Sequence, residues 1–188
     1  MHLSEKPLLM PLLSGWRRNV WLGFLIIASM ASNFVFACAT PFAALATVSV
    51  MTLALNEALC FMLMVWLANQ LVGFSFLGYP HTLDSLLWGA AIGAGAMAAT
   101  LVARMTVVRC KAIGHEFRLA IVFAAAFVAY ELMLVLAALT PLGGLNEFTF
   151  QILWQVFSVD AVALMVLCGL NRLACALGLA ALPEKLTA

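Results

Sequence analysis

The sequence has little charge for its length. Of its 188 residues, nine are Lys or Arg and eight are Asp or Glu, so only 9% of the chain is charged. Ordinary soluble domains carry about 25% charged residues. Because 66% of the residues are hydrophobic, the composition excludes such a domain and indicates an all-α integral membrane protein. The net charge of +1 points to no nucleic acid partner.

The sequence also lacks the short motifs of common enzymes and metal sites. It contains no H-E-x-x-H, G-x-S-x-G, P-loop or G-x-G-x-x-G pattern. Its five cysteines include no C-x-x-C pair. We therefore expect no classical enzyme and no intrinsic cofactor.

In place of charge, the sequence has long apolar runs. Runs of about 20 apolar residues can cross a membrane as helices. The chain has room for six such helices in one membrane domain over residues 1–188, predicted at about 19–38, 41–56, 57–77, 84–103, 119–140 and 149–170. Turn signals at 40–41, 78–81 and 140–144 indicate connections on one face. The polar pair Asn56-Glu57 is expected to mark a turn on the other face.

The nine basic residues all fall on one side of this arrangement. Because cytoplasmic loops retain Lys and Arg, both termini are predicted to be cytoplasmic. The basic residues lie before the first span, around the fourth connection and after the sixth span: Lys6, Arg17, Arg18; Arg104, Arg109, Lys111, Arg118; Arg172, Lys185.

Two carboxyl groups are predicted inside the membrane. Glu131 lies in the fifth predicted helix and Asp160 in the sixth, each about eleven or twelve residues from one end, which places both near the middle of the bilayer. Intramembrane charge is costly and tends to be functional. With no Lys or Arg at that depth, the pair is expected to be protonated, to share a proton or to hold a cation. Hydrogen bonding between helices, with Tyr130, Ser158 and Gln155 as local partners, is the structural alternative, and contact with a substrate is a third.

Small residues recur every four positions in the fourth predicted helix. Examples are Gly89 and Gly93 on one stripe and Ala91, Gly95 and Ala99 on another. Such a helix can approach its neighbours closely. The pattern fits tight packing within the bundle, and it also fits a smooth face that slides against a neighbour or binds a partner.

A group of polar side chains is predicted at the external mouth. Amides and hydroxyls over an apolar, aromatic floor suit a bulky solute with amide or hydroxyl edges better than a bare ion, which would require convergent carboxylates. Taken singly, each of these residues also fits a solvated loop position or a helix cap. The predicted ligand-binding residues are Cys38, Thr40, Asn69, Gln70, Tyr79, His81, Asp84, Asn146, Glu147, Gln151 and Gln155.

Cys38 and His81 are the external candidates for binding a metal, whether free or held in a macrocycle. Thiolate and imidazole both suit late first-row metals. The other four cysteines are expected in the membrane or at its inner face, so no disulfide framework is predicted. A buried cysteine is more often a small hydrophobic residue than a ligand.

The chain resembles the substrate-binding S components of energy-coupling-factor vitamin transporters, most of all the solitary BtuM-like cobalamin transporters. The resemblance covers most of the chain and includes the six helices with both ends inside. The residues that carry it are Asn56-Glu57-Ala58, Trp66-Leu67-Ala68-Asn69-Gln70, Gly73-Phe74 and Gly78-Tyr79-Pro80.

This resemblance implies a protein of the bacterial inner membrane that takes up cobalamin, as a substrate rather than a resident cofactor, through a cavity open to the outside. It also implies a cysteine thiolate that ligates the cobalt and, in some members, removes the cyano group. Topology favours Cys38 for this role, while Cys60 is expected at the inner end of its helix. Cys60 becomes a candidate if helices 2 and 3 turn elsewhere.

Docking on a shared transmembrane and ATPase module is less expected than solitary action. S components that share such a module resemble one another in an Ala-x-x-x-Ala pattern on their first helix, where this chain has Ala28 and Ser32. Two other functions remain open. One is a small proton- or cation-coupled transporter or channel that uses Glu131 and Asp160, and the other is a non-transporting membrane scaffold.

Overall fold

The computed structural model describes residues 19, 22–23 and 40–176, with the side chains of 174–176 excepted. The predicted first span, 19–38, therefore lies almost wholly outside the described residues, as do Cys38 and both termini. Asn19, Leu22 and Gly23 are helical.

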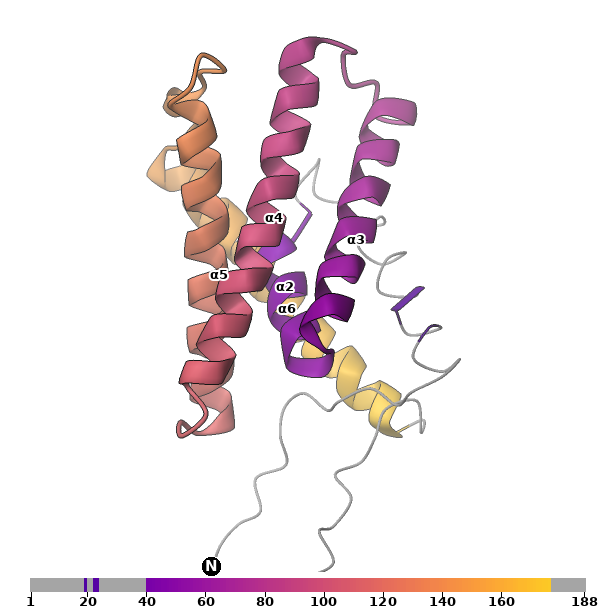
Figure 1. Cartoon of the computed structure of the whole chain (residues 1–188), viewed down its shortest axis with the longest axis vertical. Coiled ribbons are helices and arrows are strands. Elements are labelled where there is room, and N and C mark those ends of the chain that lie inside the picture. Colours follow the sequence, from indigo (N-terminus) through magenta and orange to yellow (C-terminus); the bar gives the residue numbers. More distant parts are fainter. Residues whose placement is uncertain (1–18, 20–21, 24–39, 177–188) are drawn as a thin grey trace, which may run out of the picture.

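The described chain is helical and contains no strand. Its elements are α2 (Phe42–Thr52), α3 (Leu55–Ser75), α4 (Leu83–Arg109), α5 (His115–Ala138), the short 3-10 helix η1 (Leu145–Glu147) and α6 (Phe150–Ala176). Figure 1 shows α3, α4 and α5 side by side, with α6 crossing obliquely behind them and α2 at the centre.

Four of these helices are long and apolar enough to cross a membrane. They are α3, α4, α5 and the segment Phe150–Leu173 of α6. They indicate a multi-pass membrane protein, as the composition predicts. The described residues do not establish six spans, because α2 is short and the first predicted span lies outside them.

The central helix α2 differs most from its predicted range. A full crossing was expected over 41–56, but α2 has 11 residues, which span about 16 Å, or about half of a hydrocarbon core of ~30 Å. All of its residues except Met51 are buried, and it packs against α3, α4, α5 and α6. It is therefore a buried half-length helix at the centre of the bundle.

The turn between α2 and α3 lies at Leu53 and Ala54, not at Asn56-Glu57. Leu53 and Ala54 both have extended backbone conformations. Glu57 lies within the first turn of α3, where its Oε2 accepts a hydrogen bond from the Ala54 N–H at 3.3 Å. The polar pair thus marks the start of a helix, because a carboxylate in the first turn satisfies a free N–H.

Glycines on α4 admit large side chains from its neighbours. The indole of Trp66 (α3) lies over Gly93, where an added Cβ would come within 2.7 Å of the ring, and its Nε1–H donates to the Gly89 carbonyl at 2.8 Å. The Tyr130 ring (α5) lies over Gly95. Of the two interpretations of these small residues, these contacts support tight packing within the bundle.

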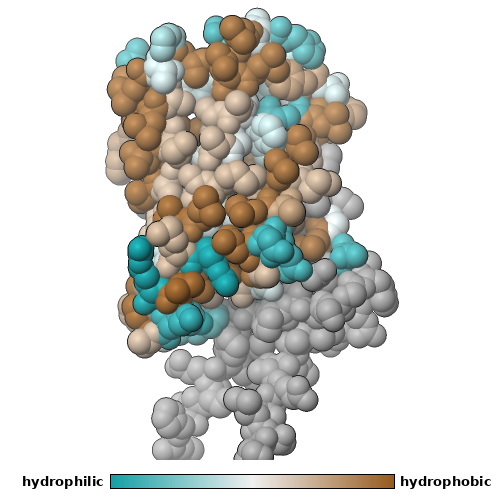
Figure 2. Space-filling view, viewed as in Figure 1, coloured by the Kyte–Doolittle hydropathy of each residue, from teal (hydrophilic) through white to brown (hydrophobic). Residues whose placement is uncertain are grey.

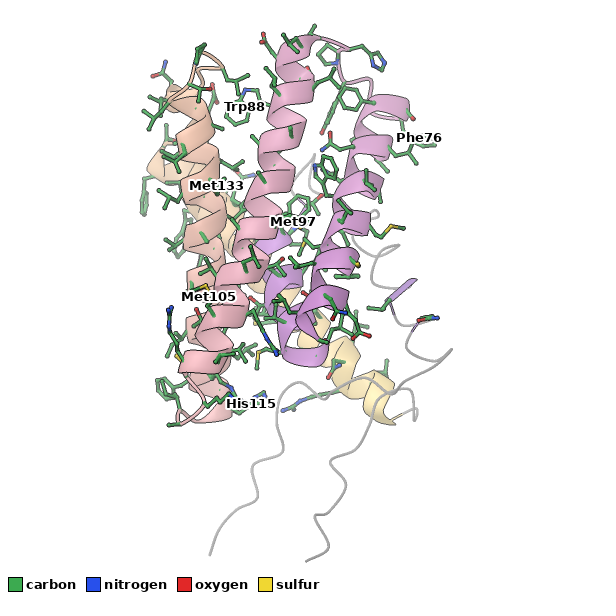
Figure 3. The ribbon with its side chains drawn as sticks, viewed as in Figure 1. Phe76, Trp88, Met97, Met105, His115 and Met133 are labelled. Atoms are coloured by element: carbon green, nitrogen blue, oxygen red, sulfur yellow. The ribbon has the colours of Figure 1, made fainter. Side chains whose placement is uncertain are left out.

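The predicted turns at 78–81 and 140–144 fall in the connections between α3 and α4 and between α5 and α6. Gly78, Gly143 and Gly144 have positive φ values of 70°, 68° and 95°, a conformation that favours glycine. Trp88 of α4 packs beneath Gly144, and Figure 3 shows it under this connection. The two loops thus lie at the same end of the bundle.

Candidate functional site

The amino end of α2 is capped by a side chain from another helix. Its N-cap residue, Pro41, makes no side-chain cap, so an N–H of the first turn needs another acceptor. Asp160 of α6 supplies it, since its Oδ1 accepts the Ala44 N–H at 2.9 Å, and the two residues are 116 positions apart. Asp160 is only 2% exposed. The buried carboxyl predicted from the sequence is therefore joined to the start of the central helix.

The other end of α2 receives a basic side chain. Arg104 of α4 donates from Nη1 to the Val50 carbonyl at 3.4 Å. α2 has no acidic residue in its first turn and no basic residue in its last, so α6 provides an acceptor for its amino end and α4 a donor for its carboxyl end. This use of Arg104 was not predicted, because neither α2 nor α4 alone shows that the two helices meet.

Side chains from α3 and α5 complete the surroundings of the start of α2. The Thr40 hydroxyl donates to Asn69 Oδ1 at 3.0 Å, which joins two of the predicted ligand-binding residues. The ring of Phe42 lies 5.6 Å from that of Tyr130, at an interplanar angle of 34°. We define the α2 junction as Thr40, Phe42, Asn69, Tyr130 and Asp160.

Glu131 lies beside this junction on α5 and is half-buried. The Asp160 carboxyl makes its hydrogen bond to the backbone of α2 and not to Glu131. Ser158, predicted as a local partner, donates instead to the Trp154 carbonyl of its own helix at 2.7 Å. The geometry thus assigns Asp160 a structural contact.

Phe74, Tyr79 and His81 form a second group, at the loop end of α3. The His81 ring stacks on Phe74 with centroids 5.3 Å apart at 24°, and Tyr79 meets Phe74 edge-on at 6.0 Å. The Tyr79 N–H donates to the Gly73 carbonyl at 3.1 Å, and an added Cβ at Gly73 would lie 2.5 Å from the Tyr79 ring. His81 is exposed, and its imidazole packs against the Phe74 ring.

The remaining predicted ligand-binding residues lie apart from these two groups. Gln70 is half-buried and packs over Gly89. The others are exposed, in the first turn of α4, in η1 and along the start of α6: Asp84, Asn146, Glu147, Gln151 and Gln155. The described members of the predicted set thus divide into the hydrogen-bonded pair Thr40 and Asn69, the packed Gln70, the aromatic group with Tyr79 and His81, and five exposed polar residues.

An aromatic row at the start of α6 was not predicted. Phe150 and Trp154 stack with centroids 6.4 Å apart at 16°, and Trp154 stacks on Phe157 at 5.9 Å and 27°. Phe157 meets Phe127 of α5 edge-on at 5.2 Å. Phe150 and Trp154 are 81% and 59% exposed. The spacing of 150 and 154 is the i, i+4 signal that could have revealed the row.

The candidate metal ligands do not converge among the described residues. Cys38 lies outside those residues. Cys60 is exposed and is the sixth residue of α3, whereas His81 follows the opposite end of that helix. Across residues 40–173, no group of three or more His, Cys, Asp or Glu side chains could hold a metal ion. Cys60 and His81 therefore do not lie together.

Comparison with known proteins gives no assignment for this chain. No family model matches it, and neither a curated protein nor a solved structure matches it.

Proposed function

We propose that the chain is a membrane transporter that binds cobalamin or a related corrinoid from an outward-facing cavity and takes it up. The sequence resemblance to S components supplies the substrate class. The half-length helix α2, whose start is buried among the long helices, is the observation that supports a transport function.

The described part of α2 begins inside the membrane bundle, beside the side chains of α3 and α6. Non-helical backbone at membrane depth is tolerated where it is buried in protein or lines a cavity. Transporters use such interrupted helices to form substrate sites near the midplane. Thr40 and Pro41 precede α2 inside the bundle and not at its edge, because Asn69, the partner of Thr40, lies 14 residues, or about 21 Å, from Leu55 along the 21-residue helix α3.

The exposed start of α6 suits a large ring with amide edges. Gln151 and Gln155 lie beside the stacked rings of Phe150 and Trp154, and all four are exposed. Apolar rings with a few polar groups are typical of small-molecule sites. In this proposal the amides hold the corrin side chains, while Cys38 or His81, with Cys60 as the remaining alternative, ligates the cobalt. Thiolate ligation would also allow decyanation of the bound vitamin.

Proton or cation coupling through Glu131 and Asp160 has less support. The Asp160 carboxyl already accepts a hydrogen bond from the start of α2, which gives it a structural role. A scaffold that uses the glycines of α4 has less support too, because Trp66 and Tyr130 cover Gly93 and Gly95. The proposed partners are the vitamin and the bilayer, and the chain either acts alone or docks on a transmembrane and ATPase module.

The proposal is tested by the visible spectrum of the purified chain after incubation with cobalamin and removal of free ligand. The chain should retain the corrin absorbance. The control variant is Cys110→Ala, which removes a free cysteine at the other end of the bundle from His81. It is compared with the variants Cys38→Ala, His81→Ala and Cys60→Ala. One of these three substitutions should shift the bands and Cys110→Ala should not. If the bands are the same in all four variants, cobalt ligation by these residues is wrong, and if no absorbance is retained, the substrate is wrong.

A further inference from the structure

The adjoining ends of α4 and α5 carry a basic surface, defined here as Arg109, Lys111 and Arg118. Arg109 and Lys111 are exposed and Arg118 is half-buried. From 104 to 118 the sequence has four basic residues and one acidic residue, Glu116. The surface is therefore strongly positive.

The three cations have no carboxylate partner within the described part of the chain. No ion pair involves them there, and the buried Nε of Arg118 has no hydrogen-bond acceptor. Arg104, in contrast, is used internally, by the Val50 carbonyl. The basic surface thus offers charge that the described fold does not neutralise.

Exposed apolar side chains alternate with these cations. Val108 is 49%, Ile113 40% and Phe117 75% exposed. In Figure 2 hydrophilic residues gather below the broad hydrophobic face, with hydrophobic residues among them, and Figure 3 places His115 at this end of the bundle. The cations therefore lie where an apolar membrane face meets a polar one.

A ligand for this surface needs an anionic group joined to an apolar body. A phosphate satisfies the guanidinium groups, and Arg pairs with phosphate through parallel hydrogen bonds. Acyl chains would cover the exposed Phe117 and Val108. Basic surfaces between transmembrane helices are suited to such headgroups, and each Lys or Arg contributes to the attraction.

We propose that Arg109, Lys111 and Arg118 bind the headgroup of an anionic phospholipid in the leaflet that surrounds this end of α4 and α5. This site is separate from the α2 junction and does not depend on the nature of the transported solute.

Native mass spectrometry of the purified full chain tests the proposal, with phosphatidylglycerol as the anionic probe and phosphatidylcholine as the neutral one. The wild type should retain phosphatidylglycerol in preference. The triple variant R109Q/K111Q/R118Q should bind it on the order of 100-fold more weakly, since each cation contributes about fivefold. Arg172→Gln, which removes an exposed cation of α6, should leave binding within about twofold of wild type on the same scale.

Three outcomes would overturn the assignment. They are equal retention of the two lipids by the wild type, unchanged retention in the triple variant, and displacement of the lipid by inorganic phosphate, which would indicate a site for free phosphate. If the triple variant does not fold, Arg109→Gln and Lys111→Gln are measured singly. Each should weaken phosphatidylglycerol binding about fivefold, and no change in either would reject the site.

Discussion

At the scale of residues, the contact between Asp160 and Ala44 has the clearest physical meaning. A carboxylate buried in a membrane bundle is costly unless donors surround it. The start of α2 provides a donor, at 2.9 Å, and the positive end of a helix dipole. The same contact satisfies an N–H that Pro41 leaves without a cap. One hydrogen bond therefore lowers the cost of burying both the carboxyl and the N–H.

Asp160→Ala should therefore destabilise the protein. The loss of a helix cap costs about 0.5–2 kcal/mol, and Asp160→Asn should cost less because its side-chain oxygen still accepts the Ala44 N–H. The free energy of unfolding in mixed micelles measures both effects. Equal stability of Asp160→Ala and wild type would contradict the cap.

Gly93 provides a test of packing between helices. Gly93→Val should cost about 1–3 kcal/mol of unfolding free energy, because overpacking forces neighbours to shift and the Trp66 ring already fills the space. Gly169→Val on α6 is the matched control, since no atom lies within 4 Å of an added Cβ there. If the two substitutions cost the same, Trp66 does not pack against Gly93 as described.

At the scale of elements, α2 depends on its neighbours rather than on its own sequence. It lacks an acidic first turn and a basic last turn, and an isolated helix of this length is marginal in water. The hydroxyls of its polar residues are satisfied internally. Those of Thr47 and Thr52, for example, donate to the carbonyls of Ala43 and Val48.

Arg104 binds the carboxyl end of α2, so its removal should destabilise α2 independently of any change at Asp160. Arg104→Gln is expected to lower the free energy of unfolding by about 0.3–1 kcal/mol. The two ends of α2 are about 16 Å apart, beyond the usual range of direct coupling, so its effect should add to that of Asp160→Asn within about 0.5 kcal/mol. A double variant that costs no more than one single variant would show that the two caps do not act separately.

Sequence patterns predicted the long helices better than the short one. Length and apolar character indicate α3 to α6, and Gly78 and Gly144 mark turns because the backbone there needs positive φ. The end of α2 was placed too late because Asn56-Glu57 fits a turn as well as the first turn of a helix. The hydrogen bond between Glu57 and the Ala54 N–H identifies the pair as the first turn of a helix. The spacing of apolar residues does not predict this bond.

At the scale of the whole molecule, the described residues 40–176 form four long helices around a fifth that is about half as long. The pairing of Thr40 with Asn69 and of Asp160 with Ala44 joins positions 29 and 116 residues apart. The sequence indicated that these residues are unusual for a membrane interior, but not which backbone or side chain each would meet. Those partners follow from how the helices cross, which local patterns do not determine.

A transporter coupled to a proton or cation gradient through Glu131 and Asp160 would respond differently to a substitution at Glu131. If Glu131 and Asp160 carried a driving proton or cation, Glu131→Gln would abolish solute uptake by intact vesicles without affecting ligand retention. We expect Glu131→Gln to retain at least half of wild-type uptake, because the proposed uptake does not use this carboxyl and the substitution removes no hydrogen bond to α2. Complete loss of uptake with normal binding would favour coupling.

The central claim is that this chain binds a corrinoid, and the ratio of cobalamin to protein after gel filtration tests it most directly. The proposal predicts a ratio near one in the wild type, with a corrin spectrum that travels with the protein. A colourless protein peak after incubation with excess cobalamin would contradict it, whatever the variants show.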